Sequence, residues 1–364
     1  MDAAGIARTR LRSSRLVGGA FTTPADAVGW HLAMQSQDYA PASWSIGQRS
    51  NGLTSMDVDT ALVDGSIVRT HVLRPTWHFV AASDVRWLLA LSGPRVLRSY
   101  AGRYAQLRLD GRSLTLGERI IVRALSGRGR LTRTQLAEAL DRARFDRSDQ
   151  RMAWLLMHCE LTGVIGSGGL DGKQQTYALL EGRVPDGPRY ERAEALVELT
   201  RRYLRSHGPA TVKDLSWWSG MTMGDLRTAL GDLGDEVAGE RVDGHELWSL
   251  VGAAGRSPVT RRAHFLQTYD ELVVGYTESR FLGQPYAERA KAAWGDRTLP
   301  SGVVLAGAGV AGHWSRRADG KGLRVEVVPY EDDDARFRSA VAKEAERLGA
   351  FFEGPVTLEV ASGR

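Results

Sequence analysis

One order of elements, three helices followed by a hairpin, occurs twice in this sequence and limits the possible folds more than any other feature. In the first occurrence, apolar residues recur with a helical period over 113–125, and Thr134 can cap a short helix over 135–140. A third helical segment follows at 149–161, and 163–180 has the pattern of two short strands around a glycine-rich turn.

The same order returns further along the chain. Helical patterns cover 189–208, 211–220 and 222–233, with Thr211 as the cap of the second. A hairpin over 236–250 then turns at Asp243-Gly244, a strong hairpin dipeptide. Three helices and a β-hairpin make the winged form of the helix-turn-helix, whose third helix usually enters a DNA groove. We therefore predict two tandem winged helices, over 111–186 and 187–256.

The N-terminal part, 1–110, fits a more divergent copy of the same unit. Helices are expected over 25–35 and 55–65, a strand over 67–81, and two further helices over 82–93 and 93–104.

The pattern changes in 257–364. Alternating apolar and small residues with glycine-rich turns predict a small β-barrel or β-sheet, with a helix over 334–352 and a last strand over 355–360. The expected fold class is α+β, with tandem winged helices and a small, barrel-like β-rich domain at the C-terminal end.

Charge is concentrated in one segment. The chain carries +5 overall, whereas 95–151 holds fourteen Arg, no Lys and six acids, a net charge of +8. Such a patch is typical of a polyanion partner, most simply nucleic acid, and Arg130, Arg133, Arg147 and Arg151 are candidates for phosphate contacts. The alternative is a set of solvated helix faces in an arginine-rich chain, since Lys occurs only five times.

Several classes of site are disfavoured by the residues present. The eight His show no HExxH or CxxC spacing, and no phosphate-binding loop, dinucleotide fingerprint or serine-nucleophile elbow occurs. We expect no metal and no cofactor. No apolar run reaches membrane-spanning length, no apolar leader is evident, and Cys159 is the single cysteine, which fits a reducing bacterial cytoplasm.

The predicted strand over 67–81 has one polar face. Arg74, Thr76 and His78 would project from it, while Trp77 and Phe79 occupy the apolar face. This combination suits contacts with phosphates or base edges. The alternative is the ordinary exposed face of a sheet.

Two amides, Gln35 and Gln37, pose a geometric problem. Gln35 follows Val28 and Leu32 at helical spacing and would continue a buried face, whereas Gln37 would point roughly 200° away on a regular helix. Both can face one pocket only if the helix ends near Gln35 and the chain becomes extended. Pro41 is consistent with an early end. The alternative is a surface or helix-end position.

These stretches resemble a known family. "MQSQDYAPASWSIGQR" followed by "VRTHVLRPTWHFV" is similar to the opening of the AlkZ/YcaQ-type bacterial DNA glycosylases, also catalogued as winged-helix DNA-binding domain proteins. "TYDELVVGY" and "GVAGHWSRR" resemble that family's C-terminal signatures. The resemblance spans almost the whole chain and implies tandem winged helices cupping DNA plus a C-terminal β-rich domain. It further implies excision of alkylated bases, chiefly N7-alkylpurines, including bulky adducts and crosslinks.

The family's catalytic signature is glutamine, a hydrophobic residue, then glutamine or aspartate. Gln35 and Gln37 match its outer positions, and Ser36 departs from the hydrophobic residue between them. We expect Gln37 to hold the attacking water and Gln35 to orient the water or the sugar, with Asp38 as a rival base if the chain turns differently. Thr76 and His78 would contact DNA near the lesion. The expected protein is a monomeric, monofunctional glycosylase acting on double-stranded DNA with alkylated bases.

Two alternatives remain open. One is a winged-helix DNA-binding protein or regulator without catalysis, because the fold alone does not fix function. The other, a special case of the glycosylase, is a self-resistance enzyme dedicated to one genotoxic natural product.

Overall fold

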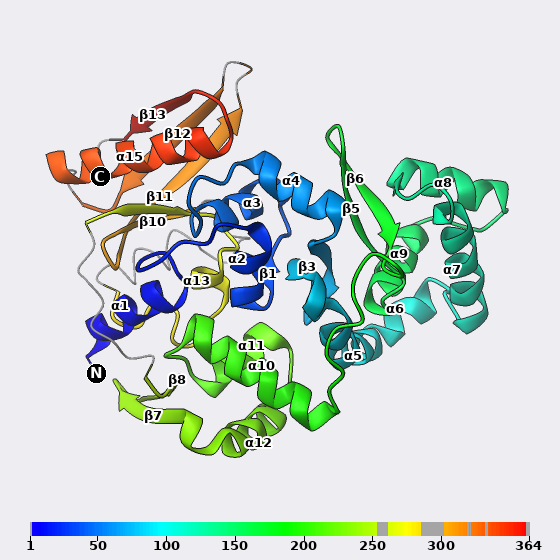
Figure 1. Cartoon of the computed structure of the whole chain (residues 1–364), viewed down its shortest axis with the longest axis horizontal. Helices are drawn as coiled ribbons and strands as arrows, with labels where there is room; N and C mark the ends of the chain where they lie inside the picture. The colour runs from blue at the N-terminus through cyan, green and yellow to red at the C-terminus, as the bar shows by residue number, and fades with distance from the viewer. Residues whose placement is uncertain are drawn as a thin grey trace.

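Among the residues that the structure describes, four β-sheets lie between the helices, so the fold is a mixed α+β arrangement, as expected. The computed structural model describes residues 2–252, 261–284, 302–318, 320, 322–331 and 334–361. Figure 1 shows the C-terminal residues, in orange and red, at one end of the molecule and the blue-green residues of the second predicted unit at the other. None of the helices in these ranges is long and apolar enough to span a lipid bilayer.

The N-terminal region builds a three-stranded sheet with the order β1-β3-β2. Its elements are α1 (Ala3–Ser13), α2 (Pro24–His31), β1 (Met34–Gln35), α3 (Tyr39–Gly47), α4 (Ser55–Asp64), β2 (Ile67–Val72), β3 (Arg74–Ala81), α5 (Ala82–Ser99) and α6 (Ala101–Gln106). Three expectations for this region need correction.

The first correction concerns the segment expected to be a helix over 25–35. Helix α2 starts where Thr23 caps it and Pro24 occupies its first turn, but it ends at His31 because Leu32 adopts a left-handed φ of 67°. The chain then extends, and Met34 pairs opposite Phe79 with both side chains in the core. Gln35 therefore lies on a strand and not on the buried face of a helix.

The second and third corrections concern 67–104. The expected single strand is a hairpin, because Leu73 takes a φ of 61° and reverses the chain between β2 and β3. The two helices expected after it are one long helix, α5, which keeps Pro94 inside it, followed by the short α6.

The second unit has the expected order of three helices and a hairpin. It contains α7 (Gly111–Leu125), β4 (Leu131–Thr132), α8 (Arg133–Arg142), α9 (Arg151–Leu161), β5 (Ile165–Asp171) and β6 (Gln174–Leu179). Thr132, and not Thr134, caps α8, and it forms a reciprocal capping box with Gln135. Leu125, Leu136 and Leu155 belong to a core that this unit shares with the end of α5, α6 and the segment after it.

The third unit repeats the order. It contains α10 (Arg192–His207), α11 (Val212–Ser219), α12 (Met223–Leu233), a short 3-10 turn over 234–236, β7 (Val237–Val242) and β8 (His245–Leu250). The hairpin turns at Asp243 and Gly244, both with positive φ, as that dipeptide predicts. Tyr203 and Trp218 share one core with Leu73 of the N-terminal region, so this unit is fused to that region by packing.

The C-terminal region is an open sheet and not a barrel within the described residues. Its elements are β9 (Ala263–Leu266), α13 (Glu271–Val274), β10 (Gly302–Ala306), β11 (Gly309–Ala318), β12 (Leu323–Pro329), α15 (Ala335–Phe351) and β13 (Val356–Val360). The sheet order is β13-β12-β11-β10-β9, with β9 and β13 as separate edges. Closure is unnecessary because α15 covers the apolar face, with Phe351 and Val341 packed into the same core as Phe265.

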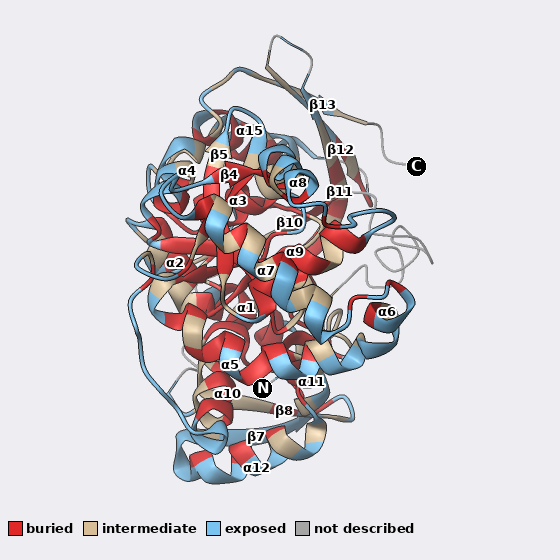
Figure 2. Cartoon of the chain, turned by 90° about the vertical axis from the view of Figure 1, so that its right-hand side faces the viewer, coloured by how far each residue is buried: buried red, intermediate tan, exposed pale blue. Residues whose placement is uncertain are grey.

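Burial follows this arrangement. Figure 2 shows buried residues along the interior of the molecule and mostly exposed ones on the outer faces of α6 and α12. The predicted boundary at 256/257 lies outside the described residues.

Candidate active site

Gln35 is held by both its backbone and its side chain. It lies on β1 opposite His78 of β3, and its side chain is only 6% exposed. The Gln35 backbone N–H donates to Oε1 of Glu271 over 2.6 Å. Its amide oxygen accepts a hydrogen bond of 2.8 Å from Nη2 of Arg74. The orientation of this amide is therefore fixed at two points.

The rest of the motif leaves the strand and bends at Gln37. Ser36 N–H donates to the carbonyl of Trp77 over 2.7 Å, which continues the pairing with β3. Arg69 donates from Nε to the Ser36 carbonyl over 2.9 Å and from Nη2 to the Gln37 carbonyl over 3.3 Å. Two successive carbonyls thus face one guanidinium, so the regular alternation of a strand ends at Ser36. Gln37 is exposed to solvent, unlike Gln35.

Ser36 replaces the hydrophobic residue of the signature and is fully buried. Its hydroxyl oxygen has no hydrogen-bond partner among the described residues. The side chain thus occupies an interior position, as a hydrophobic residue would, while its backbone carries the hydrogen bonds that hold the motif.

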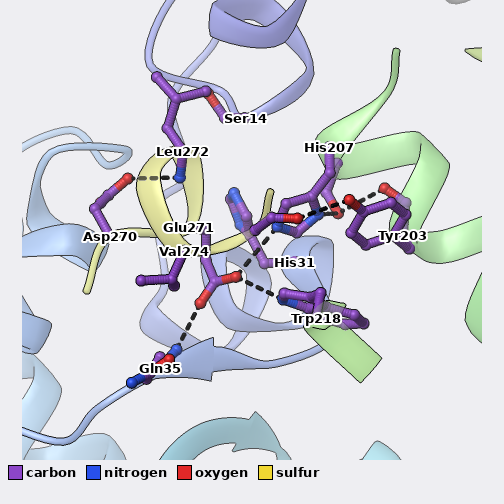
Figure 3. Close-up of polar contacts among 12 residues, drawn as sticks. Ser14, His31, Gln35, Tyr203, His207, Trp218, Asp270, Glu271, Leu272 and Val274 are labelled. Atoms are coloured by element: carbon purple, nitrogen blue, oxygen red, sulfur yellow. Dashed lines mark hydrogen bonds and ion pairs between the residues drawn. The ribbon is translucent and has the colours of Figure 1, made fainter. Parts of the chain in front are cut away.

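Glu271, at the start of α13, connects the motif to the third unit. Its Oε2 accepts from Nε2–H of His207 over 3.1 Å and from Nε1–H of Trp218 over 2.8 Å (Figure 3). Burial alone would favour the neutral acid, but the hydrogen bonds from His207 and from the Gln35 backbone outweigh it and lower the pKa of Glu271 to about 2. The carboxylate is therefore ionised at neutral pH.

The partner imidazole is fixed as well. His207 stacks on Tyr203, with ring centres 4.6 Å apart and planes 7° from parallel. Its Nδ1 lies 2.8 Å from the Ser206 hydroxyl, and the Tyr203 hydroxyl donates to the carbonyl of Gly275 over 2.7 Å. The support beneath Gln35 is a rigid polar cluster with few degrees of freedom.

The polar face predicted to meet DNA points largely inward. Arg74 is partly buried and directed at Gln35, and burial lowers the pKa of its guanidinium while the Glu271 charge opposes that effect. His78 is fully buried, and burial lowers its pKa to about 3. Thr76 is half-buried, with its carbonyl 2.9 Å from Nδ1 of His78. Arg74, Thr76 and His78 do lie beside the motif, but the structure does not place His78 at the surface.

The four predicted arginines of the second unit divide into two kinds. Arg130, Arg133 and Arg147 are exposed, and Arg147 forms an ion pair of 2.6 Å with Asp141. Arg151 is buried, and its guanidinium donates to the Asp146 carbonyl over 2.7 Å and to the Arg108 carbonyl over 3.0 Å. The contacts of Arg151 are internal to the protein.

The second unit also reaches the motif through its hairpin. The backbone N–H of Arg69 donates to the Ser167 hydroxyl over 2.9 Å, and the Arg69 guanidinium contacts the amide oxygen of Gln175. Arg69 thus joins the glutamine motif to β5 and β6.

Sequence reasoning missed several residues around the site. Glu271 lay within the stretch "TYDELVVGY", where an acid interrupts an apolar pattern, and that was a usable signal. Trp217, on α11, is half-exposed, donates Nε1–H to the Val274 carbonyl over 3.2 Å, and lies with its ring centre 5.6 Å from the Arg74 guanidinium carbon. In the sequence, the stretch "WWS" was the only signal for Trp217.

A cleft of about 480 Å³ opens next to the motif. Its lining includes Asp38, Gln267, Arg316 and Phe352, so the rival base Asp38 faces this cleft. Within the described ranges, no group of three or more His, Cys, Asp or Glu is placed to hold a metal ion.

Comparison with known proteins identifies the family. The model of the DNA glycosylase AlkZ-like family matches residues 28–351. The chain belongs to the AlkZ-like DNA glycosylases. The interstrand DNA cross-link repair glycosylase of Streptomyces sahachiroi is 24% identical over 346 residues, 88% of each chain. The solved structure of Streptomyces sahachiroi DNA glycosylase AlkZ superposes with a TM-score of 0.76 at 21% identity, covering 99% of this chain and 100% of that one.

Family membership confirms the resemblance read from the two glutamine and C-terminal stretches. The matched residues include the motif at Gln35 and Gln37 and its buried partner Glu271. This AlkZ-like chain is therefore a DNA glycosylase homologue, and DNA repair is its setting.

Proposed function

We propose that this AlkZ-like protein excises alkylated purines that carry a positive charge, by adding water to C1′ of the deoxyribose. In the proposed reaction the water oxygen bonds to C1′, the C1′–N9 bond breaks, the purine leaves as a neutral base, and one proton passes to solvent. The product is an abasic site. The sequence around the motif contains no lysine, which argues against a Schiff-base lyase step.

Neutral amides suffice for this chemistry because the substrate is already activated. An N7-alkylpurine leaves without a general acid, and C1′ becomes oxocarbenium-like as the bond breaks. The protein must then place a water and direct dipoles at the developing positive charge. A carbonyl oxygen can do both, but it is a weaker base than a carboxylate. Neutral damaged bases such as uracil should therefore not be released.

The contrast between the two glutamines carries the proposal. Gln35 is buried and its amide oxygen is engaged by Arg74, which leaves its NH2 group as the end able to orient a water. Gln37 is exposed at the bend two residues further along and would present its carbonyl to that water. We assign Gln37 to the attacking water and Gln35 to its orientation.

We further propose that the two repeated units are tandem winged helices and that the second of them makes the phosphate contacts with double-stranded DNA. The exposed Arg130, Arg133 and Arg147 would contact phosphates, which positions a protein without specifying sequence. The Streptomyces sahachiroi relative is described as an interstrand cross-link repair glycosylase. By analogy, bulky or crosslinked N7 adducts are proposed substrates here, acted on by a monomer in a bacterial cytoplasm.

The test is base release from a duplex carrying one N7-methylguanine, with alkaline cleavage of the abasic site as the readout. Wild type should release the base, and Gln37→Ala should slow single-turnover release by about 10²–10³-fold, the usual loss for a group acting at developing charge. Asp38→Asn is the matched control and should keep most of the rate. A uracil duplex should stay intact.

The alternative function is DNA binding without catalysis. Wild type and Gln37→Ala would then both bind DNA in a salt-dependent way, and neither would release N7-methylguanine or a bulkier N7 adduct. That result would replace the proposed glycosylase activity with DNA binding alone. If Asp38→Asn abolishes release and Gln37→Ala does not, the water belongs to the carboxylate.

A further inference from the structure

We propose that Glu271 is a positioning residue for the glutamine motif, fixing Gln35 from the side of β1 that has no neighbouring strand. The inference rests on the proposed function, because it gives Glu271 a part in the same reaction. It goes beyond that function by naming a buried acid, 236 positions away in sequence, on which the geometry of the motif depends.

The first support is the place of β1 in its sheet. The sheet order β1-β3-β2 makes β1 an edge strand, and β1 is two residues long. On its inner side the motif is joined to β3, where Ser36 N–H donates to the Trp77 carbonyl. On its outer side a buried Gln35 N–H would have no strand to pair with. Glu271 Oε1 accepts that N–H at 2.6 Å and so replaces the missing strand.

The second support is that Glu271 has no freedom to move. Its side chain is 1% exposed, and its other oxygen accepts from both His207 and Trp218. In Figure 3 the carboxylate lies between the Gln35 backbone and the rings of His207 and Trp218. Three donors from three separate elements converge on one carboxylate, so its position is set by the third unit as well as by α13.

The third support is electrostatic. Arg74 holds the Gln35 amide oxygen, and burial works against its charge, whereas the Glu271 carboxylate favours that charge. Glu271 therefore supports both ends of Gln35, the backbone directly and the side chain through Arg74. A neutral amide of the same shape would lose the charge effect on Arg74 and would have one acceptor oxygen for donors that now share two.

The neighbouring acid offers a matched control. Asp270 is also fully buried, but it forms a bidentate pair of 2.8 Å with Arg49 and caps Leu272 N–H at 3.0 Å. Neither Asp270 nor Arg49 contacts the glutamine motif. Asp270→Asn removes a buried charge next to Glu271 without removing the bond to Gln35.

The experiment compares Glu271→Gln with Asp270→Asn in the full chain. Glu271→Gln keeps the shape but sets an amide NH2 against one of the N–H donors. We expect it to lower the single-turnover release of N7-methylguanine by about 10–100-fold, the usual loss for a group that orients a reacting residue, and to leave affinity for undamaged duplex within about twofold. Asp270→Asn should lower the melting temperature and keep the release rate within about threefold when assayed below it.

A second measurement does not depend on catalysis. Hydrogen exchange followed by mass spectrometry on the peptide containing 33–38 should show faster exchange in Glu271→Gln and no change in Asp270→Asn. Trp218→Phe removes one donor to Glu271 and keeps the bond from Gln35. If Glu271→Gln does not fold, Trp218→Phe takes its place and should show faster exchange over 33–38 than wild type, whereas unchanged exchange would overturn the role of Glu271.

The outcomes are separable. Equal loss of release rate in Glu271→Gln and Asp270→Asn, or unchanged exchange over 33–38 in Glu271→Gln, overturns the positioning role. If wild type releases no base but exchange over 33–38 accelerates only in Glu271→Gln, the proposed reaction fails and the positioning of the motif by Glu271 stands.

Discussion

The second and third units share one order of elements but differ in charge and in what they pack against. Residues 111–186 hold twelve Lys and Arg against nine Asp and Glu, whereas 187–256 hold nine against eleven. The second unit has its own core and exposes Arg130 and Arg133. The third unit shares its core with the N-terminal region. Its His207 and Trp218 donate hydrogen bonds to Glu271.

The arginines of the third unit show the same difference. Arg201 pairs with Glu236 at 2.8 Å, and Arg202 pairs with Asp84 of the N-terminal region at 2.5 Å. Arg205 donates to the carbonyl of Trp30 over 3.1 Å. Arg202 and Arg205 thus join the unit to the N-terminal region, whereas Arg201 pairs within the unit. The same element order therefore occurs in two copies that differ in charge and packing. Under the proposed function, the second unit contacts DNA and reaches the motif through Arg69, whereas the third holds the motif through Glu271.

The largest expected difference is between the second unit and the rest of the protein, in their response to acid. Burial lowers the pKa of His31, His78 and His264 to about 3, and all three lie outside the second unit. Within the second unit burial lowers the pKa of one histidine, His158, which is less buried. In the unfolded chain these imidazoles titrate near pH 6.5, so the unfolded state binds more protons between pH 6.5 and 3. Stability is thus full above pH 6.5 and lost as pH falls, by about 1.4 kcal/mol per pH unit for each imidazole.

Urea unfolding between pH 7.5 and 4, combined with hydrogen exchange by segment, measures this. The region around the motif should lose protection before 111–180 does. His264→Leu removes one of the three proton-binding sites and should flatten the pH dependence. If the second unit loses its exchange protection first on acidification, the expected difference in acid stability is wrong.

Truncating one core residue in each unit should affect base release differently. Trp218→Ala, in the third unit, is expected to cost about 3–5 kcal/mol and to abolish base release, because it removes a donor to Glu271 and a core ring. Leu136→Ala, in the second unit, should cost about 2–5 kcal/mol. Below its melting temperature it should keep the single-turnover rate at saturating DNA. Equal loss of that rate in both variants would contradict the division of roles.

Arg151 tests the division within the second unit. Arg151→Met should cost about 2–3 kcal/mol, since the carbonyls of Asp146 and Arg108 lose a charged donor. The salt dependence of DNA affinity should stay unchanged. A shallower salt dependence in Arg151→Met would instead return this residue to the DNA-contacting group predicted from the sequence.

The smallest expected effect in free energy concerns the exposed arginines. The double variant Arg130→Ala/Arg133→Ala should weaken binding of any duplex by about tenfold near 0.1 M salt and reduce the slope of log affinity against log salt by about 2. The release rate at saturating DNA should not change. Arg227→Ala, an exposed arginine of the third unit, is the matched control. If it weakens DNA binding as much, both units contact DNA.

Periodicity and turn residues predicted most of the fold. The two repeated units, the caps at Thr211 and the turn at Asp243 and Gly244 follow from local chemistry and were found within a few residues. The errors lay where a non-glycine residue adopts a positive φ. Leu32 and Leu73 end a helix and reverse a strand, respectively, and nothing in a leucine marks that conformation.

The site was predictable only in part, for a different reason. Gln35 and Gln37 were identified by a short motif, and the condition that the helix ends before them is met by the structure. The partners of the motif, Glu271 and Arg69, come from distant parts of the chain, and no local pattern pairs them with it. The prediction of a barrel-like C-terminal domain was wrong, because strand patterns do not reveal whether a helix or another strand covers the apolar face of a sheet.

The distance along the chain between Gln35 and Glu271 has a consequence for synthesis. Domains fold in order as the chain emerges, so the basic second unit is complete while the carboxylate that holds Gln35 is still to be made. Under the proposed function, a chain that stops between 187 and 270 is a DNA-binding fragment with an unsupported motif. Base excision would therefore require synthesis of the chain through Glu271, and a truncated protein would bind DNA without releasing a base.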